Sequence, residues 1–259
     1  MQSGDARKRL IQTTAVVAIA LLVIGIVVYA VVRPENPPTT LSSGAGTTPG
    51  ISDKPTHPSM LITGDSFTAG TGAQTPRTGY PCLVAKAMGW FCNVDAQGGT
   101  GFINDGHKLR SGNRPLIDRL AADKAQYLAD VVIVDAGRND GLWPAEQIAA
   151  AARRYFRTVR TTWPKAEVVY LAPAYLTTTA SGAYRTALMS LLRTEVDAVG
   201  GVLIDPVAES WYAAKATKQY VSADRIHPNQ AGHQYIADRL VSDLRKAGLD
   251  KVQITDIPS

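Results

Sequence analysis

From Ser59 onward, short runs of β-branched residues alternate with longer helical patterns, and this alternation predicts an α/β protein, a three-layer α/β/α sandwich. Because βαβ units place successive strands parallel, we expect one sheet of about five parallel strands with helices on both faces. The chain has 259 residues, of which 45% are hydrophobic and 19% charged, enough for one substantial core. One folded domain with appended segments is therefore the expected organisation.

The expected strands are rich in Val and Ile and are bounded by glycine, proline or polar turns; they cover residues 59–64, 91–97, 130–137, 167–174 and 202–206. The expected helices carry apolar residues at helical spacing and cover residues 80–88, 114–122, 144–163, 183–199 and 230–247. Pro144 at a first helical position and Glu146 in the first turn favour the third of these helices. Residues 101–113 and 177–182 are expected to be loops that shape a substrate cleft.

A membrane anchor is expected near the N-terminus. Residues 10–32 carry no charge over 23 positions, and a helix of that length spans roughly 34 Å, enough to cross the hydrocarbon core. Basic residues at 7–9 precede it, so the positive-inside rule predicts a cytoplasmic segment 1–9 and an extracytoplasmic remainder. A cleaved signal peptide is the alternative, because residues 28–30 suit a cleavage site, but the long apolar stretch favours an uncleaved single-pass anchor.

Residues 33–58 are expected to form a tether, since they hold six Pro, three Gly and eight Ser or Thr in 26 positions. The folded domain is then expected to cover residues 59–250, followed by a tail at 251–259. The formal net charge of +5 falls to +3 without residues 1–32. So small and scattered an excess argues against a nucleic-acid partner.

The two cysteines, Cys82 and Cys92, lie on an expected helix and at the start of the next strand. Because both would lie in an oxidising compartment, we expect a disulfide; two buried free thiols are the alternative. Two thiolates without nearby histidines offer too few ligands for zinc, so no metal is expected.

Ser66 follows an apolar run that breaks at Gly64, where a strand ends and a helix can begin. Free N–H groups at such a helix start favour a nucleophile whose attack creates negative charge. A serine hydroxyl also needs a base. Asp224 stands three residues before His227 in a turn closed by Pro228, a spacing at which the carboxylate reaches imidazole Nδ1 and leaves Nε2 facing outward.

Donors for an oxyanion are expected at the same sheet edge. A buried strand ends in residues 137–140, which sets the amide of Asn139 beside Ser66. Residues 97–101 end another strand with glycines whose bare backbone N–H groups can approach a substrate closely. Each motif alone is typical of an ordinary turn or loop, but their co-occurrence indicates a nucleophile with polarised donors.

Four blocks resemble those of the SGNH (GDSL-like) hydrolases in order and spacing: Gly64-Asp65-Ser66, Gly99 within Gly98-Gly99-Thr100-Gly101, Gly137-Arg138-Asn139-Asp140 and Asp224-Arg225-Ile226-His227. The resemblance covers roughly residues 59–248. It implies a flavodoxin-like sheet with strand order 2-1-3-4-5.

The resemblance also implies residue roles. Ser66 would be the nucleophile, with His227 as its base and Asp224 as the residue that orients the base. The oxyanion hole would consist of the Ser66 N–H, the Gly99 N–H and the Asn139 side chain, with Gly98 as the alternative to Gly99. Three further residues match family positions and are interpreted as structural hydrogen-bonding groups, namely Asp65, Asp140 and His233.

These residues predict an extracytoplasmic serine esterase that cleaves O-acyl esters through an acyl-enzyme, without metal or cofactor. A tethered enzyme outside a membrane reaches the cell envelope, so the expected substrate is an acylated envelope glycan or glycolipid. Two alternatives keep the same chemistry: an O-acyltransferase that passes the acyl group to a sugar hydroxyl, and a lipase or thioesterase. A non-catalytic glycan-binding module is the alternative from another class.

Overall fold

The structure of the protein is a computed structural model that describes residues 56–174, 182–212 and 219–254. The expected cytoplasmic segment 1–9, the expected anchor 10–32, nearly all of the tether and most of the loop at 177–182 lie outside these ranges. Across the described ranges, no helix combines the length and the apolar character that spanning a membrane requires.

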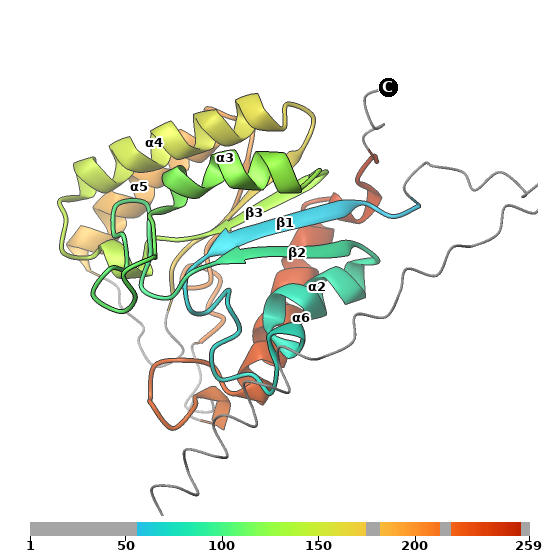
Figure 1. Ribbon diagram of the computed structural model, residues 1–259, viewed down its shortest axis with the longest axis horizontal. Helices are drawn as coiled ribbons and strands as arrows, with labels where there is room; N and C mark the ends of the chain where they lie inside the picture. The colour runs from blue at the N-terminus through green and yellow to red at the C-terminus, as the bar shows by residue number, and fades with distance from the viewer. Residues whose placement is uncertain (1–55, 175–181, 213–218, 255–259) are drawn as a thin grey trace, which may run out of the picture. The chain divides into compact units, whose positions relative to one another are not determined.

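Five parallel strands form one sheet in the order β2-β1-β3-β4-β5, which confirms the predicted order (Figure 1). The strands are β1 (Ser59–Gly64), β2 (Phe91–Ala96), β3 (Val131–Asp135), β4 (Glu167–Leu171) and β5 (Val202–Ile204). In register, Gly64 at the end of β1 pairs with Ala96 of β2 and Asp135 of β3. The carboxyl ends of these three strands therefore meet where the strand order reverses, the usual ligand position in open α/β sheets.

Helices cover both faces of the sheet. Helices α3 (Leu116–Gln126), α4 (Ala145–Thr162) and α5 (Ala183–Asp197) lie on one face, and α2 (Tyr80–Met88) and α6 (Gln230–Lys246) lie on the other (Figure 1). Among the described residues, the short 3₁₀ helices η1 (Pro76–Thr78), η2 (Arg138–Asp140) and η4 (Leu249–Lys251) lie between or after them. This arrangement confirms the expected α/β/α sandwich.

The core is divided by the sheet into two layers, because successive strand side chains point to opposite faces. Met60 and Ile62 of β1 pack in the layer with α2 and α6, whereas Leu61 packs in the layer with α3, α4 and α5. Thr63, on the same face as Leu61, places its hydroxyl 2.9 Å from that of Tyr155 on α4. The buried positions of β1 therefore fix its register, and this register determines where the residues after β1 lie relative to the neighbouring strands.

Several expected boundaries are corrected. Strands β3, β4 and β5 end at Asp135, Leu171 and Ile204, before the expected residues 137, 174 and 206. Helix α3 begins at Leu116 rather than at 114, because Pro115 is extended at the N-cap and a residue before proline disfavours helix, and it continues to Gln126. Pro144 is likewise the N-cap of α4 and not its first helical residue. No helix begins directly after Ser66; the chain forms turns and bends as far as η1.

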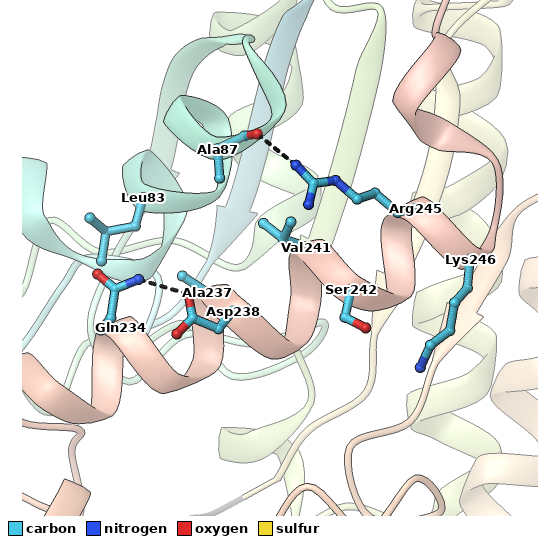
Figure 2. Close-up of a pocket in the computed structure, with 9 residues that line it drawn as sticks. All are labelled: Leu83, Ala87, Gln234, Ala237, Asp238, Val241, Ser242, Arg245 and Lys246. Carbon is cyan, nitrogen blue, oxygen red and sulfur yellow. Dashed lines mark hydrogen bonds between the residues drawn. The ribbon is translucent and has the colours of Figure 1, made fainter.

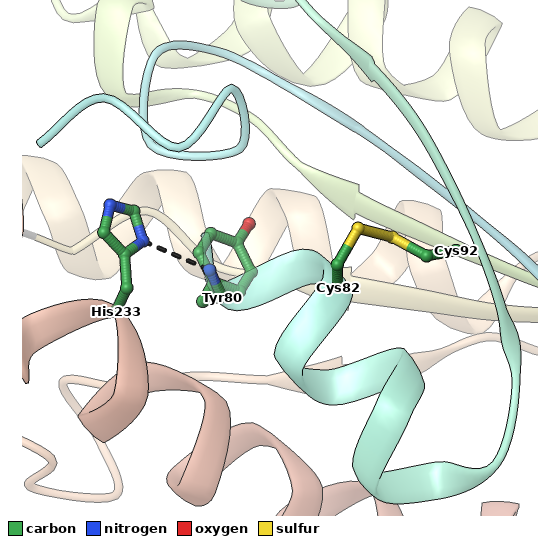
Figure 3. The surroundings of a disulfide bond; sticks show 4 residues. All are labelled: Tyr80, Cys82, Cys92 and His233. Atoms are coloured by element: carbon green, nitrogen blue, oxygen red, sulfur yellow. Dashed lines mark hydrogen bonds between the residues drawn. A yellow bond between two sulfur atoms is a disulfide. The ribbon is translucent and has the colours of Figure 1, made fainter. Parts of the chain in front are cut away.

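The predicted disulfide between Cys82 and Cys92 is present and joins α2 to β2 (Figure 3). Free cysteines are absent, since the chain has two and both are paired. The bridge connects the helix that follows the Ser66 turns to the strand that precedes the glycine pair.

Candidate active site

Ser66 lies on a tight turn directly after β1. A Cβ on Gly64 would lie 2.6 Å from the Asp135 carbonyl oxygen, so this position requires glycine for the strands to pack. The chain then coils, and the Thr71 N–H donates to the Ser66 carbonyl oxygen at 3.0 Å. Within the part of the chain that the structure describes, the Ser66 N–H has no acceptor, so it is available to a bound group.

His227 is presented by a loop between β5 and α6. Val221 and Pro228 form an isolated antiparallel bridge, and the Ser222 N–H donates to the His227 carbonyl oxygen at 2.8 Å. Asn229 follows the loop, and its side chain accepts at 2.9 Å from an N–H in the first turn of α6. The loop thus holds His227 between a backbone bridge and a capped helix.

The loop brings His227 onto Ser66 as predicted. Nε2 of the ring lies 2.8 Å from Ser66 Oγ, and Nδ1 lies 2.6 Å from Asp224 Oδ2. With a carboxylate at Nδ1, that nitrogen carries the ring proton and Nε2 accepts from the serine hydroxyl. The three side chains therefore connect in the order that a nucleophile, its base and an orienting carboxylate require.

Asp224 is held in its ionised form. Its Oδ1 accepts from Ser222 Oγ at 2.7 Å and from the N–H groups of Ile226 and His227 at 2.9 and 3.0 Å. The His227 side chain, together with these backbone donors, lowers the pKa of Asp224 well below its usual range. An ionised Asp224 fixes the tautomer of His227 and stabilises the imidazolium that forms during proton transfer.

Gly98 and Gly99 form the tip of a turn after β2. The Gln97 carbonyl oxygen accepts from the N–H and the hydroxyl of Thr100 at 3.3 and 2.7 Å, and the φ of 77° at Gly99 favours glycine. A Cβ on Gly98 would lie 3.8 Å from that of Ser66. The N–H groups of both glycines find no acceptor among the described residues, so this turn offers open donors beside Ser66.

Asp140 fastens the loop that follows these glycines. Its carboxylate accepts from three backbone N–H groups, those of Phe102, Ile103 and Asn104, at 2.8, 3.1 and 2.9 Å. Burial raises the pKa of Asp140 against the opposing effect of these bonds. Its contacts are those of a structural hydrogen-bonding residue, as the sequence indicated.

Asn139 lies on η2 at the same edge of the sheet. Its Nδ2 donates to the Thr100 carbonyl oxygen at 2.9 Å and to Asp65 Oδ2 at 3.2 Å. Asp65 in turn accepts from the Phe67 N–H at 2.9 Å, and burial raises its pKa to about 6. The structure therefore places the Asn139 amide against the residue that precedes the nucleophile.

Arg138 is a residue of the site that the sequence patterns did not single out. Its side chain is 6% exposed, and Nη1 lies 2.6 Å from Asp135 Oδ1 and 3.3 Å from Asp65 Oδ2. The guanidinium carbon lies 4.3 Å from the centre of the Phe67 ring, which is 5.5 Å from the ring of His227. The available signal was Asp135 at the end of an apolar strand, since a buried carboxylate requires a partner.

His233 ties the Ser66 turns to two helices. Its Nδ1 accepts from the Tyr80 N–H at 3.2 Å, a bond drawn in Figure 3, and its Nε2 donates to the Thr71 carbonyl oxygen at 3.1 Å. Burial lowers the pKa of His233, which favours the neutral ring that these bonds need. These contacts match the predicted structural role.

The hollow between α2 and α6 is separate from this group of residues. It is lined by Leu83, Ala87, Gln234, Ala237, Asp238, Val241, Ser242, Arg245 and Lys246, none of which belongs to the predicted site (Figure 2). As far as residues 56–174, 182–212 and 219–254 are concerned, no group of three or more His, Cys, Asp or Glu side chains is arranged to hold a metal ion.

Comparison with known proteins connects this geometry to a family. Residues 62–235 match the family described as GDSL-like lipase/acylhydrolase. A GDSL lipase of Mycobacterium tuberculosis is 30% identical over 191 residues, which cover 70% of this chain and 79% of that protein.

Solved structures share the fold at lower identity. A carbohydrate esterase family 2 enzyme with a carbohydrate binding domain, from Corynascus thermopiles (Myceliophthora fergusii), superposes with a TM-score of 0.58 at 20% identity, covering 76% of this chain and 68% of that one. A salicylyl-acyltransferase from a tetracycline biosynthetic pathway gives a TM-score of 0.57 at 17% identity, covering 78% of this chain and 58% of that one. At these identities the likeness shows the fold alone.

Proposed function

We infer that this chain, which belongs to the GDSL-like lipase/acylhydrolase family and is a serine hydrolase acting on esters, cleaves O-acyl esters with Ser66, His227 and Asp224. The observation that carries this inference is the pair of contacts from His227, 2.8 Å to Ser66 Oγ and 2.6 Å to Asp224 Oδ2.

The reaction proceeds through an acyl-enzyme. Ser66 Oγ attacks the ester carbonyl carbon while His227 Nε2 takes the hydroxyl proton. The bond to the alcohol oxygen then breaks, and the imidazolium gives its proton to the leaving alkoxide. Water, deprotonated by the same nitrogen, attacks the acyl carbon. The bond from this carbon to Ser66 Oγ then breaks, Oγ takes the proton from the imidazolium, and the carboxylic acid leaves.

Charge that develops on the carbonyl oxygen is stabilised by the Ser66 N–H, the Gly99 N–H and the Asn139 amide. The orientation of the peptide between Gly98 and Gly99 favours the Gly99 N–H as the oxyanion donor. The Gly98 carbonyl oxygen accepts from Asn113 Nδ2 at 2.8 Å, and the N–H of a trans peptide points opposite to its carbonyl. The Gly99 N–H therefore faces away from Asn113 and its loop.

Replacement of Asn139 tests this oxyanion hole. Asn139→Ala should lower kcat roughly 10²–10³-fold and leave KM near its starting value, because the donor acts on charge present only in the transition state. Asn93→Ala is the control, since Asn93 donates to Ser59 Oγ at the opposite end of the sheet and should keep kcat. A large rise in KM with kcat intact would instead assign Asn139 to substrate binding.

The substrate is proposed to be an acylated glycan or glycolipid of the cell envelope. A carbohydrate esterase with the same fold supports a glycan ester. A lipase is the second candidate: Leu109, 74% exposed, has its Cδ1 2.6 Å from where a Gly99 Cβ would lie, and Ile226, 52% exposed, precedes His227. Apolar side chains on two loops of the site would favour an acyl chain.

A chain-length series of nitrophenyl esters, from acetyl to palmitoyl, separates these candidates with the purified full-length chain. A glycan deacylase should prefer acetyl and other short esters, whereas a rise in kcat/KM with chain length would favour the lipase. Acyl transfer to an added glycan in preference to water would make the enzyme an O-acyltransferase. Ester cleavage that persists in Ser66→Ala, or failure of a phosphonate to label Ser66, would overturn the proposed nucleophile.

The proposed location is the cell membrane, with the N-terminus cytoplasmic and the esterase domain outside. The uncharged stretch at 10–32 and the Cys82–Cys92 disulfide support it, since disulfides persist in oxidising compartments. N-terminal sequencing of membrane fractions should find the unprocessed N-terminus. Mature protein that begins near residue 31 would refute the anchor and leave a secreted enzyme.

A further inference from the structure

Arg138 lies between two buried carboxylates, those of Asp65 and Asp135, and Asp65 directly precedes the nucleophile. Asp65 is 1% exposed and Asp135 is fully buried, and the guanidinium reaches both through Nη1. Burial alone would lower the pKa of Arg138, but Asp135 and Asp65 outweigh burial and raise it well above its usual value. The guanidinium is therefore a permanent positive charge within the site.

Asp65 Oδ2 contacts both the Arg138 guanidinium and the Asn139 amide. It lies 3.3 Å from Arg138 Nη1 and accepts from Asn139 Nδ2 at 3.2 Å, while the second Asn139 bond goes to the Thr100 carbonyl oxygen. An amide nitrogen has two hydrogens, so both are engaged within the protein. To stabilise an oxyanion, Asn139 must turn one hydrogen away from an acceptor that it now holds.

The bond to Asp65 is the longer of the two, so it is the one that Asn139 would break to donate to the substrate oxyanion. If Asn139 leaves a buried carboxylate, that carboxylate needs another partner, because an unpaired buried charge is strongly unfavourable. Arg138 is already in contact with the same oxygen. It can therefore hold Asp65 while the amide turns toward the reacting carbonyl.

We propose that Arg138 is a positioning residue of the oxyanion hole, which acts through Asp65 on the Asn139 amide. This inference rests on the proposed function above, because it needs Asn139 to serve the transition state. Arg138 touches no reacting atom in this role. It keeps Asp65 paired as the Asn139 amide moves between its resting acceptor and the oxyanion.

Kinetic coupling between Arg138 and Asn139 tests the proposal. With 4-nitrophenyl acetate and full-length protein, Arg138→Met should lower kcat about 10-fold and change KM less than about twofold. In an Asn139→Ala background the same substitution should lower kcat less than about twofold, because the residue through which it acts is gone. Arg138→Lys, which keeps a positive charge, should recover part of the loss.

Arg160→Met controls for the loss of a guanidinium. Arg160 donates to the carbonyl oxygens of Val199 and Ala166 near the end of α4 remote from the site, so its loss should lower stability and leave kcat unchanged. Folding of each variant is checked by circular dichroism. If Arg138→Met does not fold, Asp65→Asn replaces it in the same double-mutant cycle with Asn139→Ala, since this isosteric change removes the linking charge.

Two results would overturn the inference while the proposed function stands: folded Arg138→Met with parental kcat, or losses from Arg138→Met and Asn139→Ala that multiply in the double variant. A different result reaches further. If Asn139→Ala alone keeps kcat, the proposed oxyanion hole is wrong, and Arg138 has no amide through which to act.

Discussion

Gly72 provides a sharp test of how the base reaches the nucleophile. It lies in the turns after Ser66 with a φ of 90°, and a Cβ built on it would lie 2.1 Å from the Pro228 carbonyl oxygen. Pro228 directly follows His227. Replacing Gly72 with alanine therefore pushes the turn that carries Ser66 away from the loop that carries His227.

The magnitude follows from that distance. Real Cβ contacts essentially never fall below 3.0 Å, so the two backbones must separate by at least about 0.9 Å. His227 Nε2 is now 2.8 Å from Ser66 Oγ, and a shift of this size takes the pair beyond hydrogen-bond distance. A misplacement of about 1 Å can cost roughly 10²-fold in rate, so Gly72→Ala should lose about 10²-fold in kcat/KM.

Gly89→Ala separates displacement from backbone strain. Gly89 has a similar φ of 72° at the end of α2, but a Cβ there would meet nothing within 4 Å. Both variants should lose about 1 kcal/mol of stability from the left-handed conformation, measured by urea unfolding, and Gly72→Ala should lose more because of its clash with Pro228. Only Gly72→Ala should lose activity on a small acetyl ester. Parental kcat/KM in Gly72→Ala, or an equal loss in Gly89→Ala, would refute the reasoning.

Three further outcomes are expected. Ser66→Ala and His227→Ala should each lower kcat about as much as the double variant, since either removes the same step, and Asp224→Asn should be milder; additive losses would place the chemistry elsewhere. Burial, reinforced by Asp95, raises the pKa of Asp123 to about 7. The protonated Asp123 carboxyl therefore stabilises the folded state below about pH 4, and this stabilisation is lost as the pH rises to about 7. Urea unfolding should find Asp123→Asn more stable than the parent at pH 8 but not at pH 4.5, and the reverse order would contradict this. Replacing Cys82 and Cys92 together with serine should lower the free energy of unfolding by about 2–3 kcal/mol, because the bridge closes a ten-residue loop, whereas an unchanged urea midpoint would mean that the bridge is idle.

The sheet was predictable because its signals are local. Strand β1 has the predicted bounds, since Pro58 and Gly64 bracket an apolar run. The β-branched runs of the other strands identify them, but β3, β4 and β5 end two or three residues before their predicted ends. The position of Asn139 near Ser66 was also predictable, because the carboxyl ends of neighbouring parallel strands share one edge. The pairing of Asp224 with His227 followed from their spacing in the sequence, and their position at Ser66 followed from the family resemblance. Boundaries failed where proline was given a helical position, as at Pro115 and Pro144.

Other features depend on partners far apart in the chain. Arg138 contacts Asp65 across 73 residues, and Gly72 meets Pro228 across 156, distances over which a local pattern carries no information. Asp135 at the end of an apolar strand pointed to some cation but did not say which. A glycine in a turn, similarly, looks the same in sequence whether or not another backbone approaches it.

The site is therefore assembled by two different means. Ser66, the glycine turn and Asn139 follow β1, β2 and β3, which are adjacent strands, so the backbone hydrogen bonds of the sheet fix their relative positions. His227 follows β5, at the far edge of the sheet, and no strand pairing places it beside Ser66. Its position depends on contacts of the α6 region with the Ser66 turns, namely Pro228 against Gly72 and His233 bonded to Thr71 and Tyr80. Weakening those contacts should consequently move the base and leave the oxyanion donors in place, so proton transfer is the step most exposed to packing changes outside the sheet.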